Sequence, residues 1–422
     1  MTNSNLNKLP HNICAGTDGG HSIRIAQAVA SPASGFDSAR LAALSRIIQS
    51  DIDAKRIPGA AMLVARNGEI ACECAFGMQD PQHGTPMTLD SIFRSYSMTK
   101  PIVSVAIMMM AEEGRLLISD PVSKYFPELK DLQVGIEKTG PDGKPMLELI
   151  PCEREMTVQD LLRHTSGLTY GIFGASLVKQ TYLVSGAESR PTNERLIKCL
   201  AKLPLAYRPG TVWEYSRSTD VLGALLERMS GTTLDVHLRE RILEPLRMTD
   251  TGFWVDSSRH HRVAEPFAVD PVTGRRVGLL DVKSRPNFLS GGGGLVSTLH
   301  DYYRFAQMLL NEGELGGTRI LSRKTLQYMT SDHLCGIPEA MSGPEYLPGA
   351  GHGFGLGFAV RIADGGAATA GTIGEYSWSG LAGTFFWIDP REKLAAIFLI
   401  QAPEHLDYYQ SLFRNLVYAA MR

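Results

Sequence analysis

The stretch SYSMTKP, residues 95–101, decides how this sequence is interpreted. Pro101 directly follows Lys100, and the apolar run PIVSVAIMMMA then covers residues 101–111. Proline is tolerated only in the first turn of a helix, where the backbone N–H groups have no partner. The pattern therefore predicts a helix that starts near Ser97, with Lys100 three residues further on and on the same face.

Two hypotheses about Ser97 follow from this position. The free N–H groups and the positive end of the helix dipole stabilise an oxyanion, so Ser97 can act as a nucleophile. Lys100 can accept its proton if burial or a nearby cation lowers the lysine pKa. The same residues fit equally well a serine that only caps the helix, beside a solvated lysine. A second Ser-x-x-Lys, from Ser176 to Lys179, lies beside a glycine-containing loop and shows no comparable helix start.

A tyrosine further along the chain supports the first hypothesis. Tyr215 lies in WEYSRSTDVLG (213–223), directly before a predicted helix. We expect Ser218, Thr219 or Asp220 to cap that helix. A phenol held on a loop before a rigid helix can point into a cleft and pass the serine proton to a leaving group.

The stretch YSWSGLAGTFFWIDP (376–390) supplies a third element. Trp378-Ser379-Gly380 leads into a predicted strand, and a glycine at a strand edge lets a substrate lie close to the backbone. The next N–H, on Leu381, can form one half of an oxyanion hole, with the N–H of Ser97 as the other half. The same stretch also fits a buried aromatic residue at the start of a strand.

Strand patterns lie near both ends of the chain. AAMLVAR and EIACECAFG are joined by Asn-Gly, a strong hairpin signal, and GTFFWI and LAAIFLI flank the turn DPREK. The middle of the chain is mostly helical. The sequence thus predicts an α/β fold in which helices flank one antiparallel sheet, with a mostly helical lobe inserted and a cleft between the lobes. The predicted parts are a polar leader (1–35), a sheet-and-helix lobe (36–96 with 285–422) and a helical lobe (97–284).

The composition indicates which partners to expect. The 42 Lys and Arg residues nearly balance the 44 Asp and Glu residues, which argues against nucleic acid and anionic membranes as partners. The longest apolar run is too short to span a membrane, and no basic region followed by an apolar core suggests a signal peptide. Six scattered cysteines fit a reducing compartment. We expect a cytoplasmic protein with a small-molecule partner, and a homo-oligomer is left open.

The order Ser-x-x-Lys, Tyr-Ser-x and Trp-x-Gly resembles the serine β-lactamase and penicillin-binding-protein superfamily. It is most similar to the family VIII carboxylesterases, relatives of class C β-lactamases. The similarity covers roughly residues 40–420, including FRSYSMTKP, LLRHTSGL, PGTVWEYSRSTDVLG, SGGGGLVST and WSGLAGTFFWIDP. The resemblance implies a β-lactamase/transpeptidase-like fold and Ser97 as the acylated nucleophile. It also implies Lys100 and Tyr215 as the proton-moving pair and the N–H groups of Ser97 and Leu381 as the oxyanion hole.

The sequence departs from this superfamily in two places. Trp378-Ser379-Gly380 stands where these proteins usually carry Lys-Thr-Gly, and a tryptophan suits a neutral ester better than a carboxylate. Arg217 stands where they usually have Asn, and its guanidinium can bind a carboxylate. The literal Lys138-Thr139-Gly140 falls between the serine and tyrosine motifs, so we expect a surface loop there. Tyr170 and Tyr376, with Phe173, are predicted to line the acyl pocket.

These features together predict a serine carboxylesterase that hydrolyses short-chain esters through an acyl-enzyme on Ser97, with no metal or organic cofactor. A β-lactamase or D-amino-peptide hydrolase, or an acyltransferase, would use the same nucleophile. A non-catalytic scaffold protein of the same fold is a remote alternative. There is no Gly-x-Ser-x-Gly and no His-Glu-x-x-His, and we expect His164 to fix a loop and not to act as a base.

Overall fold

The computed structural model describes residues 34–187, 192–343 and 345–422. The predicted polar leader (1–35) falls almost entirely outside these residues. Among the helices in the described ranges, none is both long and apolar enough to cross a membrane.

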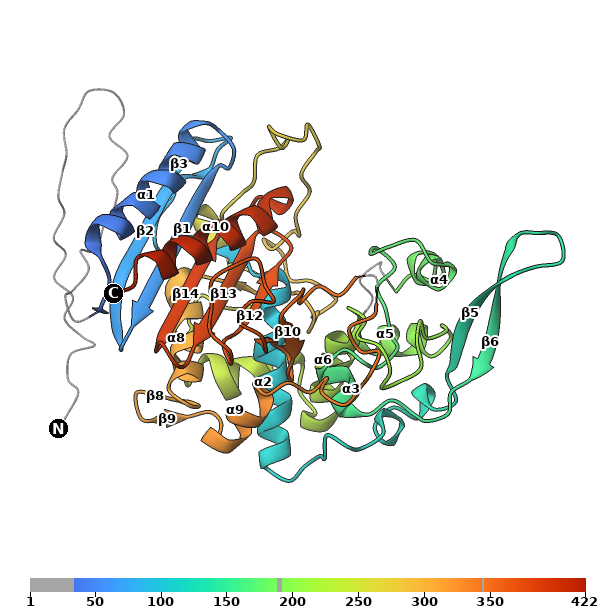
Figure 1. Cartoon of the computed structure of the whole chain (residues 1–422). Coiled ribbons are helices and arrows are strands. Elements are labelled where there is room, and N and C mark those ends of the chain that lie inside the picture. Colours follow the sequence, from blue (N-terminus) through green and yellow to red (C-terminus); the bar gives the residue numbers. More distant parts are fainter. Residues whose placement is uncertain (1–33, 188–191, 344) are drawn as a thin grey trace.

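The central feature is an eight-stranded antiparallel sheet built from both ends of the chain (Figure 1). The N-terminal strand β1 pairs with the C-terminal β14 from Ala61 opposite Leu399 to Arg66 opposite Leu394. The strand order is β10-β11-β12-β13-β14-β1-β2-β3, which confirms the predicted α/β fold. The strands are β1 (Gly59–Arg66), β2 (Glu69–Asp80), β3 (Thr85–Pro86), β10 (His352–Phe354), β11 (Ala359–Arg361), β12 (Tyr376–Gly380), β13 (Thr384–Asp389) and β14 (Leu394–Leu399).

Helices cover both faces of this sheet, and its strands are therefore buried on both sides. α1 (Ser38–Asp53) and α10 (Leu406–Ala419) pack on one face, where Cys72 and Cys74 of β2 are also buried. α2 (Thr99–Glu112) and α8 (Leu299–Leu310) lie against the other face (Figure 1). The second face therefore carries the helix that begins at the Ser-x-x-Lys motif.

The region between the two sheet-forming ends is rich in short helices and irregular segments. The helices are α3 (Val158–Leu162), α4 (Leu177–Val184), α5 (Asn193–Leu200), α6 (Ser218–Ser230), α7 (Leu234–Leu238) and, nearer the C-terminus, α9 (Arg323–Met329). Short two-stranded pairs join β4 (Phe93–Arg94) to β7 (Val296–Ser297) and β8 (Glu314–Leu315) to β9 (Thr318–Arg319).

A hairpin in this region differs from the prediction. β5 (Gln133–Thr139) and β6 (Pro145–Pro151) form a two-stranded hairpin that projects from the body of the molecule (Figure 1). Lys138 and Thr139 are the last residues of β5, and Gly140 begins the turn. The literal Lys-Thr-Gly thus lies on the surface as expected, but at the tip of a hairpin and not in a plain loop.

Two predictions about helix N-termini are wrong. α6 begins at Ser218, but its N-cap residue is Arg217 with no side-chain cap, so none of Ser218, Thr219 and Asp220 caps it. α4, for which the sequence predicted no helix start, is capped by Ser176, whose Oγ accepts the N–H of Lys179 at 3.2 Å. The preceding glycine-containing loop hid this cap, because a serine before a short helix leaves little periodic signal.

Candidate active site

Ser97 lies in a tight turn directly before α2. The 3₁₀ turn η3 (Tyr96–Met98) carries it, and the Ser95 N–H donates to the Leu295 carbonyl at 2.9 Å, which ties the turn to its neighbour. Tyr96 has a φ of 45°, a conformation that bulky residues rarely adopt and that costs on the order of 1–3 kcal/mol. Ser97 itself is half-buried and faces a cavity.

Lys100 is only 1% exposed and lies directly behind Ser97. Its Nζ is 3.3 Å from Ser97 Oγ, 3.3 Å from the Tyr170 hydroxyl and 2.7 Å from the Gly292 carbonyl oxygen. Burial lowers the pKa of Lys100 to about 7, while the charge of Asp220 opposes this shift. The alternative of a solvated lysine is therefore wrong. A substantial fraction of the amine is neutral near pH 7 and can accept the Ser97 proton.

The ring of Tyr215 also packs against the Lys100 amine. Lys100 Nζ lies 4.4 Å from the centre of the Tyr215 ring, and the phenol is buried. Burial raises the pKa of Tyr215 above its usual value, and a polar contact with Ser97 only partly offsets this. The hydroxyl is therefore protonated at neutral pH, which suits it to relaying a proton and not to acting as the resting base.

Asp220 is a buried carboxylate that the sequence assigned only to a helix cap. It accepts hydrogen bonds from Ser290 Oγ at 2.6 Å and from the Gly292 N–H at 2.9 Å, and it pairs with Arg217 at 3.1 Å. Since the carbonyl of the same Gly292 contacts Lys100, Asp220 holds the residue that positions the amine. A Cβ at residue 292 would lie 2.9 Å from the Tyr170 hydroxyl and 3.0 Å from the Asp220 carboxylate oxygens, so a larger residue would displace these side chains. The run of glycines in SGGGGLVST was the available signal.

Arg217 lines the cavity, but its charge is already balanced. Its guanidinium lies 4.9 Å from the centre of the Tyr170 ring and pairs with Asp220. The predicted carboxylate-binding arginine is thus held by a carboxylate of the protein itself.

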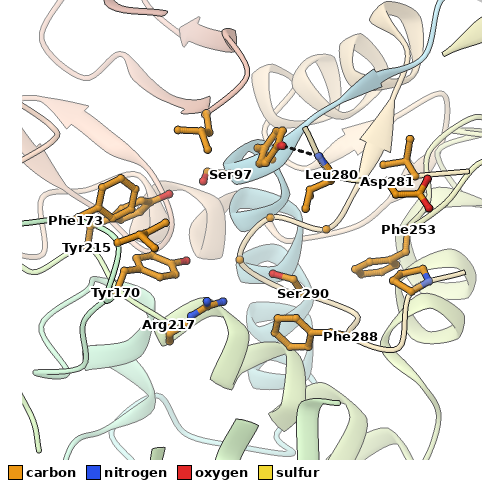
Figure 2. A pocket seen from close by; sticks show the side chains of 18 residues that line it. Ser97, Tyr170, Phe173, Tyr215, Arg217, Phe253, Leu280, Asp281, Phe288 and Ser290 are labelled. Atoms are coloured by element: carbon orange, nitrogen blue, oxygen red, sulfur yellow. Dashed lines mark hydrogen bonds between the residues drawn. The ribbon is translucent and has the colours of Figure 1, made fainter. Parts of the chain in front are cut away.

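The cavity in front of Ser97 has a volume of about 290 Å³ (Figure 2). Tyr170, Phe173, Tyr215 and Leu381, all named from the sequence, line it. Its other lining residues are mostly apolar side chains from irregular segments that show no periodic pattern, which is why the sequence did not point to them: Ile172, Phe253, Leu280, Val282, Pro286 and Phe288.

Four residues predicted to bind substrate do not line the described cavity, and one of them, Trp378, packs against Tyr215 instead. Tyr376 is buried on β12 against Phe358, with ring centres 5.2 Å apart, and does not line the described cavity. Ser379 and Gly380 do not line it either. A Cβ at residue 380 would lie 2.2 Å from the Ser95 carbonyl oxygen. This glycine is therefore needed for β12 to pack against the turn that carries the serine, and not to make room for substrate.

Trp378 and His164 support Tyr215 from behind. Their rings lie 5.6 and 5.2 Å, respectively, from the Tyr215 ring. His164 Nδ1 is 3.1 Å from Ser216 Oγ, and burial holds the pKa of His164 well below its usual value. A neutral, buried imidazole packed on Tyr215 fits the predicted loop-fixing role. Within the described residues, no group of three or more His, Cys, Asp or Glu side chains is placed to hold a metal ion.

An antiparallel sheet formed by both chain ends, with a Ser-x-x-Lys at the start of a buried helix and a tyrosine opposite, defines the class of serine β-lactamase-like proteins. The family model described as Beta-lactamase matches residues 44–420. The chain belongs to this family.

The relatives include an uncharacterized protein, an esterase and a hydrolase. The uncharacterized protein, from Mycobacterium tuberculosis, is 33% identical over 363 residues, which cover 84% of this chain and 88% of that protein. Esterase EstB of Burkholderia gladioli is 31% identical over 390 residues, covering 86% of this chain and 91% of EstB. The solved structure of EstCE1, a hydrolase with promiscuous acyltransferase activity, matches with a TM-score of 0.76 at 25% identity. The match covers 92% of this chain and all (100%) of EstCE1. These similarities confirm the resemblance to the esterases of the β-lactamase-like superfamily.

Proposed function

We propose that this protein is a serine carboxylesterase that hydrolyses uncharged esters of short acyl groups through an acyl-enzyme on Ser97. One observation carries the proposal: the amine of Lys100 is buried 3.3 Å from Ser97 Oγ, and its pKa is lowered to about 7. A neutral base in contact with the serine hydroxyl is what activates serine as a nucleophile. The similarity to Esterase EstB supports an ester as substrate.

The first half of the reaction forms the acyl-enzyme. Ser97 Oγ attacks the ester carbonyl carbon, and its proton moves to the neutral amine of Lys100. The N–H groups of Ser97 and Leu381 stabilise the resulting oxyanion. The bond from carbon to the alcohol oxygen then breaks, and Lys100 returns the proton through the Tyr215 hydroxyl to the leaving alkoxide.

Water completes the turnover in the second half. The Lys100–Tyr215 pair takes a proton from water as the water oxygen attacks the acyl carbon. The bond from that carbon to Ser97 Oγ breaks, the serine regains its proton, and the carboxylic acid leaves. An alcohol in place of water would give a new ester. The description of EstCE1 favours this acyl transfer as a second activity, which product analysis with added alcohol would test.

The charges around the cavity support a neutral substrate. Arg217 is the one cationic side chain among the described lining residues, and Asp220 pairs with it. Asp281, an exposed carboxylate at the cavity, adds a negative charge. β-Lactams and D-amino peptides carry a carboxylate that this lining would not attract.

Hydrolysis of p-nitrophenyl butyrate by matched serine variants tests the proposal. We expect Ser97→Ala to lose turnover and the acyl adduct seen by intact-protein mass spectrometry, because the variant lacks the hydroxyl that attacks the ester. Ser176→Ala, in the second Ser-x-x-Lys, should retain turnover and serves as the control. Equal turnover by wild type and Ser97→Ala would rule the proposal out.

We also propose a cytoplasmic location. The cysteines in the described residues are free thiols, as is usual in a reducing compartment. Fractionation of the source cells tests this, because finding the chain only outside the cytoplasmic fraction would contradict it.

A further inference from the structure

The cavity presents different surfaces on the two sides of the nucleophile. Figure 2 shows Tyr215 and Phe173 on one side of Ser97, and Leu280 and Phe253 on the other. Tyr215 and Phe173 come from the loops that precede α6 and α4, whereas Leu280 and Phe253 come from irregular segments after α7. The two sides can therefore hold different parts of one ester.

We call the side opposite Tyr215 the distal wall. It is apolar, and its two phenylalanines are buried. The carboxylate of Asp281, at its edge, accepts hydrogen bonds from the Lys283 N–H at 2.9 Å and from Ser284 Oγ at 2.7 Å, so its own loop holds it. Phe253, Leu280 and Phe288 form this wall, and Val282 and Pro286, close to Leu280 and Phe288 in the chain, also line the cavity.

Two residues just before the nucleophile anchor this wall. The Tyr96 hydroxyl accepts the N–H of Leu280 at 2.9 Å (dashed in Figure 2), and Arg94 Nε donates to the Leu280 carbonyl at 2.6 Å. Both backbone groups of Leu280 are therefore bound by residues within three positions of Ser97. The strained φ of 45° at Tyr96 is part of this arrangement. Two hydrogen bonds therefore hold Leu280 against the segment that carries the nucleophile.

The direction of proton transfer decides which part of the ester meets the wall. The leaving oxygen must lie within hydrogen-bond reach of the group that protonates it, so the alcohol part lies toward Tyr215. The acyl group is attached through another bond of the same carbon and points away from it. We infer that the distal wall is the binding subsite for an uncharged, apolar acyl group, and that Tyr96 is the residue that positions this subsite. This inference rests on the proposed esterase function.

Two substrate series and two matched variants test the assignment. In the first series the alcohol is constant and the acyl group grows, from p-nitrophenyl acetate to p-nitrophenyl butyrate. In the second the acetyl group is constant and the alcohol grows, from phenyl acetate to 2-naphthyl acetate. Phe253→Ala alters the distal wall, whereas Phe173→Ala alters the opposite side. For each variant the measured quantity is the ratio of kcat/KM for the larger substrate to that for the smaller one.

We expect a double dissociation. Phe253→Ala should lower the butyrate-to-acetate ratio about tenfold and change the naphthyl-to-phenyl ratio less than about twofold, because a lost apolar contact affects only the group that makes it. Phe173→Ala should do the reverse. If Phe253→Ala changes only the alcohol series, or both variants change both ratios equally, the assignment is overturned. If wild type hydrolyses no member of either series, the proposed function fails and the subsite with it.

Tyr96→Phe tests the anchor without changing the wall itself. The variant keeps the ring and removes the oxygen that accepts the Leu280 N–H. We expect the ratio of kcat/KM for p-nitrophenyl butyrate to that for p-nitrophenyl acetate to fall about threefold, mainly through a higher KM for the butyrate. A fall in kcat of the same size for both esters would show a general effect on the nucleophile turn and would overturn the positioning role.

Discussion

The chain carries two copies of Ser-x-x-Lys, and the partners of the two lysines differ. Ser97 lies in the turn before α2 and Ser176 caps α4, and both lysines are buried, with Lys100 1% and Lys179 6% exposed. Lys100 faces neutral oxygens, whereas Lys179 Nζ lies 3.0 Å from a Glu214 carboxylate oxygen and 3.2 Å from one of Glu345.

The pKa values of the two lysines move in opposite directions. Burial lowers the pKa of Lys100 to about 7. Burial also acts on Lys179, but hydrogen bonds and charge from Glu214 and Glu345 outweigh it and raise the pKa. Lys179 is therefore a fixed cation at neutral pH. Burial makes an amine easier to deprotonate and a contacting carboxylate reverses this effect, so of the two buried lysines only Lys100 can act as a base.

Replacing each lysine by methionine should separate the two sites most clearly. Lys100→Met removes the base beside Ser97, and we expect kcat for p-nitrophenyl butyrate to fall about 10³-fold. Lys179→Met removes no group that touches the nucleophile, so the folded fraction should keep its kcat. Stopped assays at 25 °C, normalised to folded protein, measure both. A loss of similar size in the two variants would show that the comparison is wrong.

The same two variants should also differ in stability, and here Lys179→Met should show the larger loss. Lys179→Met leaves Glu214 as an unpaired buried charge, which costs on the order of 3–5 kcal/mol of unfolding free energy. Urea unfolding followed by fluorescence measures this. Lys179→Arg, which keeps the positive charge, is the control and should recover most of the loss. If Lys179→Met is as stable as wild type, Glu214 does not depend on this lysine.

The electrostatic account of Lys100 makes a prediction about pH. With a pKa of about 7, Lys100 must lose its proton before it can act, so kcat/KM should rise with pH through about 7. The charge of Asp220 raises this pKa and that of Arg217 lowers it. Asp220→Asn should therefore move the midpoint to lower pH, and Arg217→Gln should move it to higher pH.

Because the two variants should shift the pH midpoint in opposite directions, the electrostatic effect can be distinguished from a general loss of structure. Both variants break the Arg217–Asp220 pair, so a loss of packing alone would move both profiles in the same way or move neither. Midpoints that shift in the same direction would contradict the electrostatic account. Lower rates at every pH are expected for Asp220→Asn in addition, because the carboxylate also holds Gly292 against Lys100.

The sequence predicted those features that a short stretch determines. A proline directly after Lys100 fixed the start of α2, and Asn67-Gly68, both with positive φ, fixed the hairpin of β1 and β2. Tyr376 and Trp378 of β12 were both predicted to bind substrate, but neither lines the described cavity. Their rings pack on Phe358 and Tyr215, and such contacts between distant residues cannot be predicted from the strand alone.

The features that the sequence did not predict depend on contacts between distant residues. Asp220 acts through Gly292, 72 residues away, and only the fold brings them together. The two carboxylates that fix the charge of Lys179 come from positions 214 and 345. The distal wall comes from irregular segments, where no period of 2 or 3.6 marks the buried residues.

The smallest expected effect concerns the second partner of Lys179. Glu345 is 29% exposed in its side chain, whereas Glu214 is 2% exposed, so water screens the outer ion pair far more than the inner one. We expect Glu345→Gln to cost about 0.5 kcal/mol of unfolding free energy, to leave kcat unchanged and to leave Lys179 charged, because Glu214 remains 3.0 Å from its amine. Urea unfolding and the ¹³Cε chemical shift of Lys179 as a function of pH measure these outcomes. A Lys179 that titrates near neutral pH in this variant would mean that the outer carboxylate, and not the buried one, keeps the second Ser-x-x-Lys from holding a neutral amine.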